Sequence, residues 1–139
     1  MDRLVIDPLI PAFQEIRFES DTFRSILARI TTDALEAAAS DAAHAKTPLI
    51  FELYENSSMR FDFRFLVEEI LGRHSHWFEF EGGAHHQLML RHGYGLGWSK
   101  FIASYLSGAL ATFSNEQPTI VIGDQFVRVE LKQRTNVGT

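Results

Sequence analysis

Three glycines at alternate positions, Gly93, Gly95 and Gly97, form the segment of this chain best suited to hold a ligand. Glycine adopts positive φ readily and lets the backbone approach a bound molecule closely. Large apolar residues recur at helical spacing directly after them, so the glycines are predicted to lie at a helix N-terminus. The free N–H groups and partial positive charge of such a terminus suit a phosphate or a carboxylate. We therefore predict that any ligand is anionic and binds near Gly93–Gly97.

Histidines gather before this segment, since five of the six lie between residues 74 and 92. On a predicted strand, His86 and His92 share a face but stand about 20 Å apart at roughly 3.3 Å per residue, too far to share an ion. His85 and His86 point to opposite faces. Pairs across a hairpin, such as His76 with His85 or His86, could converge, and Glu79 or Glu81 would have to complete the set. Because zinc normally needs three or four converging ligands, the pattern favours surface or internally bonded histidines over a metal site.

The first half of the chain is predicted to be mainly helical. A helix capped by Asp21 is expected to end before Pro48, because the residue before a proline disfavours helix. The segment 49–54 fits either a helix or a strand, and helix is preferred. Residues 61–65 alternate as in a strand, and the spacing then turns helical up to Gly72.

The second half is predicted to hold two hairpins with a helix between them. The hairpins are expected over residues 77–92 and 119–131, and the helix over 96–113. Together with the first half, this order predicts an α+β fold: a single two-layer domain with a mostly antiparallel sheet covered on one face by about three helices.

Composition narrows the classes of protein. A length of 139 residues fits one domain over 1–139, with an N-terminal arm over 1–11 and a frayed tail over 133–139. The absence of cysteine excludes disulfides and thiolate metal sites and fits a reducing compartment. A net charge of −5 argues against non-specific nucleic-acid binding, and no apolar run reaches the length of a membrane span. We expect a cytoplasmic protein with no membrane or nucleic-acid partner.

Three short segments fall in the order of an ATP site. Glu52 and Asn56 stand four residues apart, which on a helix places both on one face. Glu81 precedes a glycine pair at 82–83, and the segment Gly93–Gly97 opens a helix. In this order and spacing the chain resembles, in degenerate form, the GHKL ATPase domain of histidine kinases and anti-sigma-factor kinases.

The resemblance implies a role for each matching residue. Glu52 would act as the base or orient a water, and Asn56 would ligate Mg²⁺ when a nucleotide binds. Glu81 stands where the family has an aspartate that reads the adenine amino group. The remaining nucleotide contacts would come from Gly83, Gly93, Gly95 and Gly97. The implied cofactor is ATP with Mg²⁺, and the implied protein is a regulatory nucleotide-binding or pseudo-ATPase domain that acts through protein partners.

The predicted helix over 96–113 supports a second hypothesis. Lys100 is its only charged residue between 98 and 113, and small residues form its far side: Ser99, Ala103, Ser104, Ser107, Gly108, Ala111 and Thr112. A helix with so little charge is usually buried on more than one side, as a central helix or at a homodimer interface. The order of helix, strands, small-residue helix and closing hairpin also resembles the TRAPP-like and vinyl-reductase-type ligand domains. That resemblance implies a non-enzymatic ligand sensor or dimerisation module.

Overall fold

The computed structural model describes residues 18–54, 62–82, 86–113 and 118–131 of the chain. Five predictions lie outside these residues: the arm over 1–11, the tail over 133–139, the ligand contacts Asn56 and Gly83, and the candidate metal ligand His85. The described residues form helices and an antiparallel sheet, which confirms the predicted α+β class.

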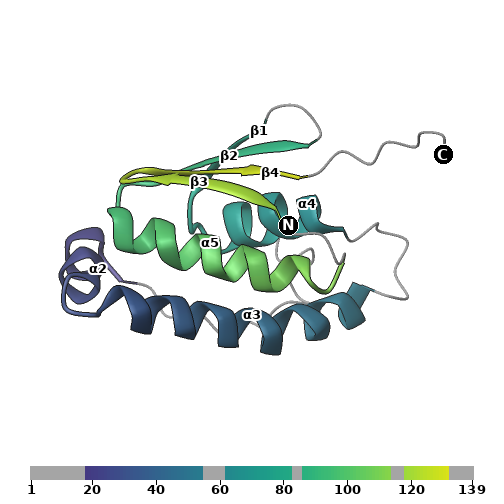
Figure 1. Ribbon diagram of the computed structural model, residues 1–139, viewed down its shortest axis with the longest axis horizontal. Coiled ribbons are helices and arrows are strands. Elements are labelled where there is room, and N and C mark those ends of the chain that lie inside the picture. The colour runs from purple at the N-terminus through teal and green to yellow at the C-terminus, as the bar shows by residue number, and fades with distance from the viewer. Residues whose placement is uncertain (1–17, 55–61, 83–85, 114–117, 132–139) are drawn as a thin grey trace, which may run out of the picture.

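The sheet has four antiparallel strands in the order β1-β2-β4-β3 (Figure 1). Their bounds are Glu79–Gly82 for β1, Gln87–Arg91 for β2, Thr119–Gly123 for β3 and Phe126–Glu130 for β4. Each predicted hairpin is present, and the pairing of β2 with β4 joins the two hairpins into one sheet. As a result, β1 and β3 form the two edges.

The helices lie on one side of the sheet (Figure 1). They are α2 (Ser20–Leu27), α3 (Thr32–Tyr54), α4 (Phe63–Phe65), the π-helix η2 (Leu66–His74) and α5 (Leu96–Leu110). The α5 helix lies between the sheet and α3, so it is the central helix of the fold. No helix among the described residues is long and apolar enough to cross a bilayer.

The α3 helix runs without a break through Pro48, so the prediction that Pro48 ends a helix is wrong. The segment 49–54 is helical, as preferred from the sequence. A proline inside a helix removes one backbone hydrogen bond and costs about 3 kcal/mol. Burial offsets this cost, because Ala43, Thr47 and Ile50 are fully buried on both sides of the proline, whose own ring is exposed.

The strand predicted from the alternating phenylalanines is also wrong where the structure describes it, because Phe63–Phe65 is helical. The Asp62 carboxylate accepts a hydrogen bond from the Phe65 N–H at 2.9 Å and so caps this helix. The chain then continues into η2, where the Ser75 N–H donates to the carbonyl of Ile70, five residues earlier, at 2.9 Å. The aspartate was the local signal that outweighed the alternation.

The core lies on both sides of α5. Ile102, Tyr105, Leu106 and Ala109 each expose 1% of their surface or less. Facing them from the sheet are the fully buried side chains of Leu88, Leu90, Val127 and Val129. The helix ends at Leu110, three residues before the predicted end at 113. The helical spacing therefore predicted the buried face of α5 correctly and its C-terminus only approximately.

Candidate functional site

The glycine segment forms the turn from β2 into α5, and its glycines serve different purposes. Gly95 is the N-cap of α5 with φ of 91°, a left-handed conformation that favours glycine. A Cβ at Gly95 would meet no atom within 4 Å, whereas a Cβ at Gly97 would lie 3.3 Å from Leu35 Cδ1. The Gly93 carbonyl accepts a hydrogen bond from Arg24 Nε at 2.9 Å. Of the three glycines, Gly95 alone leaves open space for a ligand.

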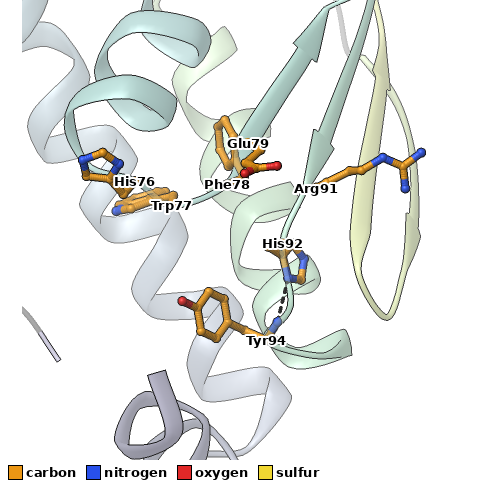
Figure 2. A pocket seen from close by; sticks show the side chains of 7 residues that line it. All are labelled: His76, Trp77, Phe78, Glu79, Arg91, His92 and Tyr94. Carbon is orange, nitrogen blue, oxygen red and sulfur yellow. Dashed lines mark hydrogen bonds between the residues drawn. The ribbon is translucent and has the colours of Figure 1, made fainter. Parts of the chain in front are cut away.

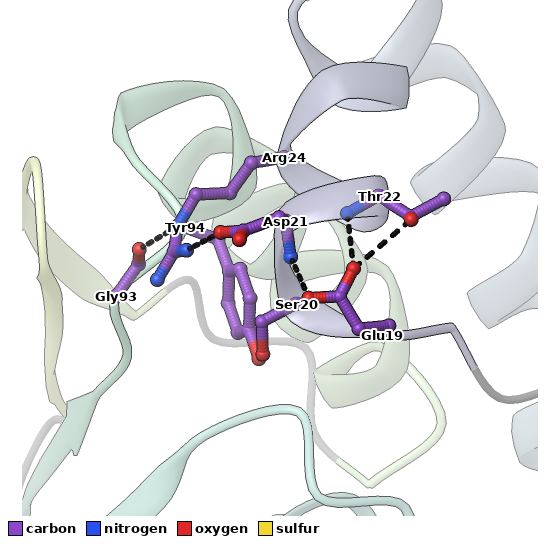
Figure 3. Close-up of polar contacts among 7 residues, drawn as sticks. All are labelled: Glu19, Ser20, Asp21, Thr22, Arg24, Gly93 and Tyr94. Carbon is purple, nitrogen blue, oxygen red and sulfur yellow. Dashed lines mark hydrogen bonds and ion pairs between the residues drawn. The ribbon is translucent and has the colours of Figure 1, made fainter.

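The α2 helix docks on this turn through Arg24 (Figure 3). Arg24 Nη1 lies 3.0 Å from Asp21 Oδ1, and Arg24 Cζ lies 5.3 Å from the centre of the Tyr94 ring. Asp21 therefore compensates the charge of Arg24. The prediction that Asp21 caps this helix is wrong. Glu19 is the cap, because its carboxylate accepts from the N–H groups of Asp21 and the next residue at 3.1 and 3.0 Å. These backbone bonds hold the pKa of Glu19 below its usual value.

A serine and a histidine meet at the start of α5, but they form a structural lock. His92 Nδ1 accepts a hydrogen bond from the Tyr94 N–H at 3.1 Å, which leaves the ring proton on Nε2. Nε2 then donates to Ser99 Oγ at 2.7 Å, and Ser99 Oγ donates to the Gly123 carbonyl at 2.6 Å. Ser99 is fully buried and its proton is committed, so the pair lacks the arrangement of a nucleophile and its base. Burial lowers the pKa of His92 from 6.5 to about 4, so the ring is neutral near pH 7.

A cleft of about 420 Å³ opens beside this lock, between the start of β1 and the end of β2 (Figure 2). Its lining residues are His76, Trp77, Phe78, Glu79, Arg91, His92 and Tyr94. His76 has φ of 58°, a left-handed conformation that is uncommon outside glycine, and it turns the chain from η2 towards β1. Strained backbone of this kind is enriched at ligand sites, which makes the cleft a candidate site.

The two outer elements of the predicted ATP site do not meet. Glu52 is exposed near the end of α3, and its neighbour Phe51 packs against Phe113, beyond the C-terminus of α5, with ring centres 5.6 Å apart. Gly95 stands at the N-terminus of α5, and the 15 residues of that helix span about 22 Å. The structure therefore places Glu52 and the glycine turn at opposite ends of α5.

The predicted acidic and histidine ligands are also dispersed. Glu81 is exposed on β1, where its Oε2 lies 2.6 Å from Arg91 Nε. His86 and His92 flank the two ends of β2, as their spacing predicts, and His85 lies outside the described residues. Within the described ranges, no three His, Asp or Glu side chains are grouped so that they could hold a metal ion.

A second hollow, of about 650 Å³, follows the small-residue face of α5 beside the edge strand β3. Its lining residues are Ala103, Ser104, Ser107, Gly108 and Ala111 of α5, Ser40 and His44 of α3, and Pro118, Ile120 and Ile122. Gly108 brings α3 close, because a Cβ there would lie 3.1 Å from Ala43 Cβ. The α3 helix thus covers part of the small-residue face, and the rest stays open towards β3. We call this hollow the β3 groove.

The aromatic cleft and the docking of α2 on the glycine turn were not predicted from the sequence. Arg24 and Gly93 stand 69 positions apart, and no local pattern links them. The cleft itself had a signal in the sequence. Trp77 and Tyr94 lie at the two ends of the predicted hairpin over 77–92, and the pairing of β1 with β2 brings these two ends close together. The left-handed backbone of His76 had no signal in the sequence.

A comparison of the chain with protein-family models, curated proteins and solved structures found no match.

Proposed function

We propose that this chain is a non-catalytic dimerisation module in which two copies join through the edge strand β3. The composition of that edge carries the proposal, because Thr119–Gly123 includes no charged side chain. Its outer side has no partner strand in the part of the chain that the structure describes. An uncharged edge strand offers a row of unpaired N–H and C=O groups to another strand, and proteins usually protect such edges.

The opposite edge of the sheet has that protection. β1 carries the charged side chains of Glu79 and Glu81, and its pairing with β2 shifts between Phe80 and Gly82. Charges and a bulge both disfavour pairing with a further strand. The contrast between the two edges supports a specific use of β3, since the same sheet has one protected edge and one unprotected edge.

A second copy of the chain fits this edge because β3 is self-complementary. Antiparallel pairing centred on Val121 sets Ile120 of one copy opposite Ile122 of the other and brings no like charges together. A two-fold arrangement of this kind is the commonest form of oligomer. Val121, which is 40% exposed, would be covered by its own copy, and the isoleucines that line the β3 groove would extend the contact.

Two observations support a non-catalytic role. The Ser99 and His92 side chains are committed to the lock that joins α5 to the turn after β3. Glu52, the residue that the ATPase resemblance assigns as base, lies at the far end of α5 from Gly95. A catalyst needs its reacting groups within hydrogen-bonding reach of one substrate.

The proposal is tested by placing a charge on the β3 edge. Light scattering of the wild-type chain should give about twice the chain mass of 15.8 kDa, and Val121→Lys should shift the protein to the monomer mass. Lysine at Val121 would set two like charges opposite each other at the centre of the pairing. Gln87→Lys is the matched control, because Gln87 is also exposed but lies on the interior strand β2. A monomeric wild type, or a Val121→Lys variant that is folded and still dimeric, would contradict the proposal.

Nucleotide binding is the competing hypothesis, and the open space at Gly95 is the observation that favours it. Calorimetry with ATP and Mg²⁺ at millimolar concentration should detect no binding if the chain is a dimerisation module. Saturable binding that is lost in Gly95→Val, with Gly93→Ala as the milder control in the same turn, would instead support the nucleotide site.

A further inference from the structure

The cleft between β1 and β2 has an aromatic wall that is held rigidly. The Trp77 ring packs edge-on against Tyr105 at 4.8 Å and Trp98 at 5.6 Å between ring centres. Trp98 Nε1 also donates a hydrogen bond to the Trp77 carbonyl at 3.0 Å. Tyr105 and Trp98 are buried on α5, so the wall is fixed to the central helix of the fold. A site fixed in this way is formed before a ligand arrives.

The charge inside the cleft is negative. Arg91 is compensated by Glu81, with Nε and Oε2 2.6 Å apart, and its guanidinium points away from the cleft in Figure 2. His92 is neutral near pH 7, and its Nδ1 already accepts the Tyr94 N–H. Glu79 makes no ion pair with any described residue. Its carboxylate therefore leaves the cleft with one uncompensated negative charge.

We propose that this cleft binds a small organic cation, an alkylated ammonium group held by the carboxylate of Glu79 and the ring of Trp77. Tryptophan is the side chain that attracts cations most strongly through its ring, and the attraction grows where water is partly excluded. Tyr94, which also lines the cleft, already makes a contact of this kind, because Arg24 Cζ lies 5.3 Å from the centre of its ring. An anion would meet the unpaired Glu79. The site is separate from the β3 edge, because its lining residues lie next to β1 and β2, at the other edge of the sheet.

Choline is a suitable probe, and 3,3-dimethylbutan-1-ol is its uncharged counterpart with carbon in place of nitrogen. The chain has two tryptophans, so the indole N–H signals of a ¹⁵N-labelled sample report Trp77 and Trp98 separately. Choline should shift the Trp77 signal in a saturable way at millimolar concentration, and the alcohol should bind about tenfold more weakly. The Trp98 signal, which depends on the bond to the Trp77 carbonyl, shows that the fold is intact.

Glu79→Gln should weaken choline binding about tenfold, since it removes the charge and keeps the shape of the side chain. Glu130→Gln makes the same change on β4, outside the cleft, and should leave the affinity unchanged. Three results would overturn the proposal: no saturable shift of Trp77 with choline, equal affinity for the alcohol, or an equal loss in the two glutamine variants. These results are independent of the oligomeric state, which Val121→Lys tests.

Discussion

Single polar residues in this protein hold distant segments together. The lock of His92 and Ser99 joins three parts of the chain, because Ser99 lies on α5, His92 follows β2, and the accepting carbonyl of Gly123 ends β3. The Tyr94 N–H bond to Nδ1 fixes the tautomer of the imidazole, and Ser99 Oγ donates to the Gly123 carbonyl at 2.6 Å with the Phe126 carbonyl further away at 3.3 Å. A fully satisfied buried network of this kind specifies one arrangement of its segments. The turn that carries Gly95 is therefore held from both sides, by the lock and by Arg24.

The lock should make the stability of the fold depend on pH. The folded-state pKa of His92 is about 4, below its usual value of 6.5, because burial disfavours the charged ring. A depressed histidine pKa gives stability that is fully present above pH 6.5 and is lost as the pH falls towards 4. After allowance for partial exposure, the loss is on the order of 2 kcal/mol. Urea unfolding of the wild type and His92→Gln should show a shallower decline for the variant in this pH range.

His86→Gln is the control for this measurement, because His86 precedes β2, at the end of the strand away from His92 and its hydrogen bonds. It should leave the pH dependence of the unfolding free energy as in the wild type. Identical slopes for His92→Gln and the wild type would mean that the imidazole is not desolvated in the folded state.

At the scale of elements, local sequence patterns predicted a helix or strand correctly where tertiary contacts favour the same structure. They failed where other contacts favour a different one. The spacing of apolar residues after Gly97 predicted α5 and its buried face. Pro48 and the phenylalanine alternation at 61–65 predicted a helix end and a strand, and both predictions were wrong. At Pro48 the outcome depends on distant residues, because the buried side of α3 packs on α5. At residues 63–65 it depends on a local contact, the cap that Asp62 provides. The helical spacing up to Gly72 did not distinguish the π-helix η2 from an α-helix, and the close approach of Phe78 to Gly72, where a Cβ would lie 3.3 Å from the ring, could not be predicted from local sequence.

Alanine substitutions on α5 should destabilise the protein more on the fully buried face of the helix than on its partly buried face. Leu106→Ala should lower the free energy of unfolding by about 2–5 kcal/mol, because Leu106 is fully buried on the central helix. Phe101 is only partly buried and stacks on Trp98 with ring centres 4.7 Å apart, so Phe101→Ala should cost less. Urea titrations with unchanged m-values would measure both losses. A larger loss for Phe101→Ala would mean that the core does not centre on Leu106.

At the scale of the whole molecule, the α+β class could be predicted but the meeting of distant residues could not. The class follows from the order of helical and alternating segments. The direction of α3 relative to α5 does not, and it decides that Phe51, the neighbour of Glu52, packs against Phe113, at the end of α5 away from Gly95. The small residues of α5 were recognised as a packing face, yet the division of that face between α3 and the open β3 groove depends on the close approach at Gly108. Site hypotheses that needed long-range geometry were therefore beyond the sequence.

The proposed dimer should make stability depend on protein concentration. Association favours the folded state by mass action, so the Tm of the wild type should fall on dilution. Val121→Lys should have a Tm that does not change with concentration, and Gln87→Lys should behave as the wild type. Calorimetric scans at two concentrations would measure this, and a wild-type Tm that is insensitive to dilution would count against a folded dimer.

The unequal edges of the sheet also limit how far assembly can proceed. If β3 of one copy pairs with β3 of another, the enlarged sheet ends at β1 on both sides. Both ends then carry the two glutamates and the bulge, which resist the addition of another strand. Growth by edge pairing therefore stops at two copies, and the exposed apolar strand does not lead to filaments.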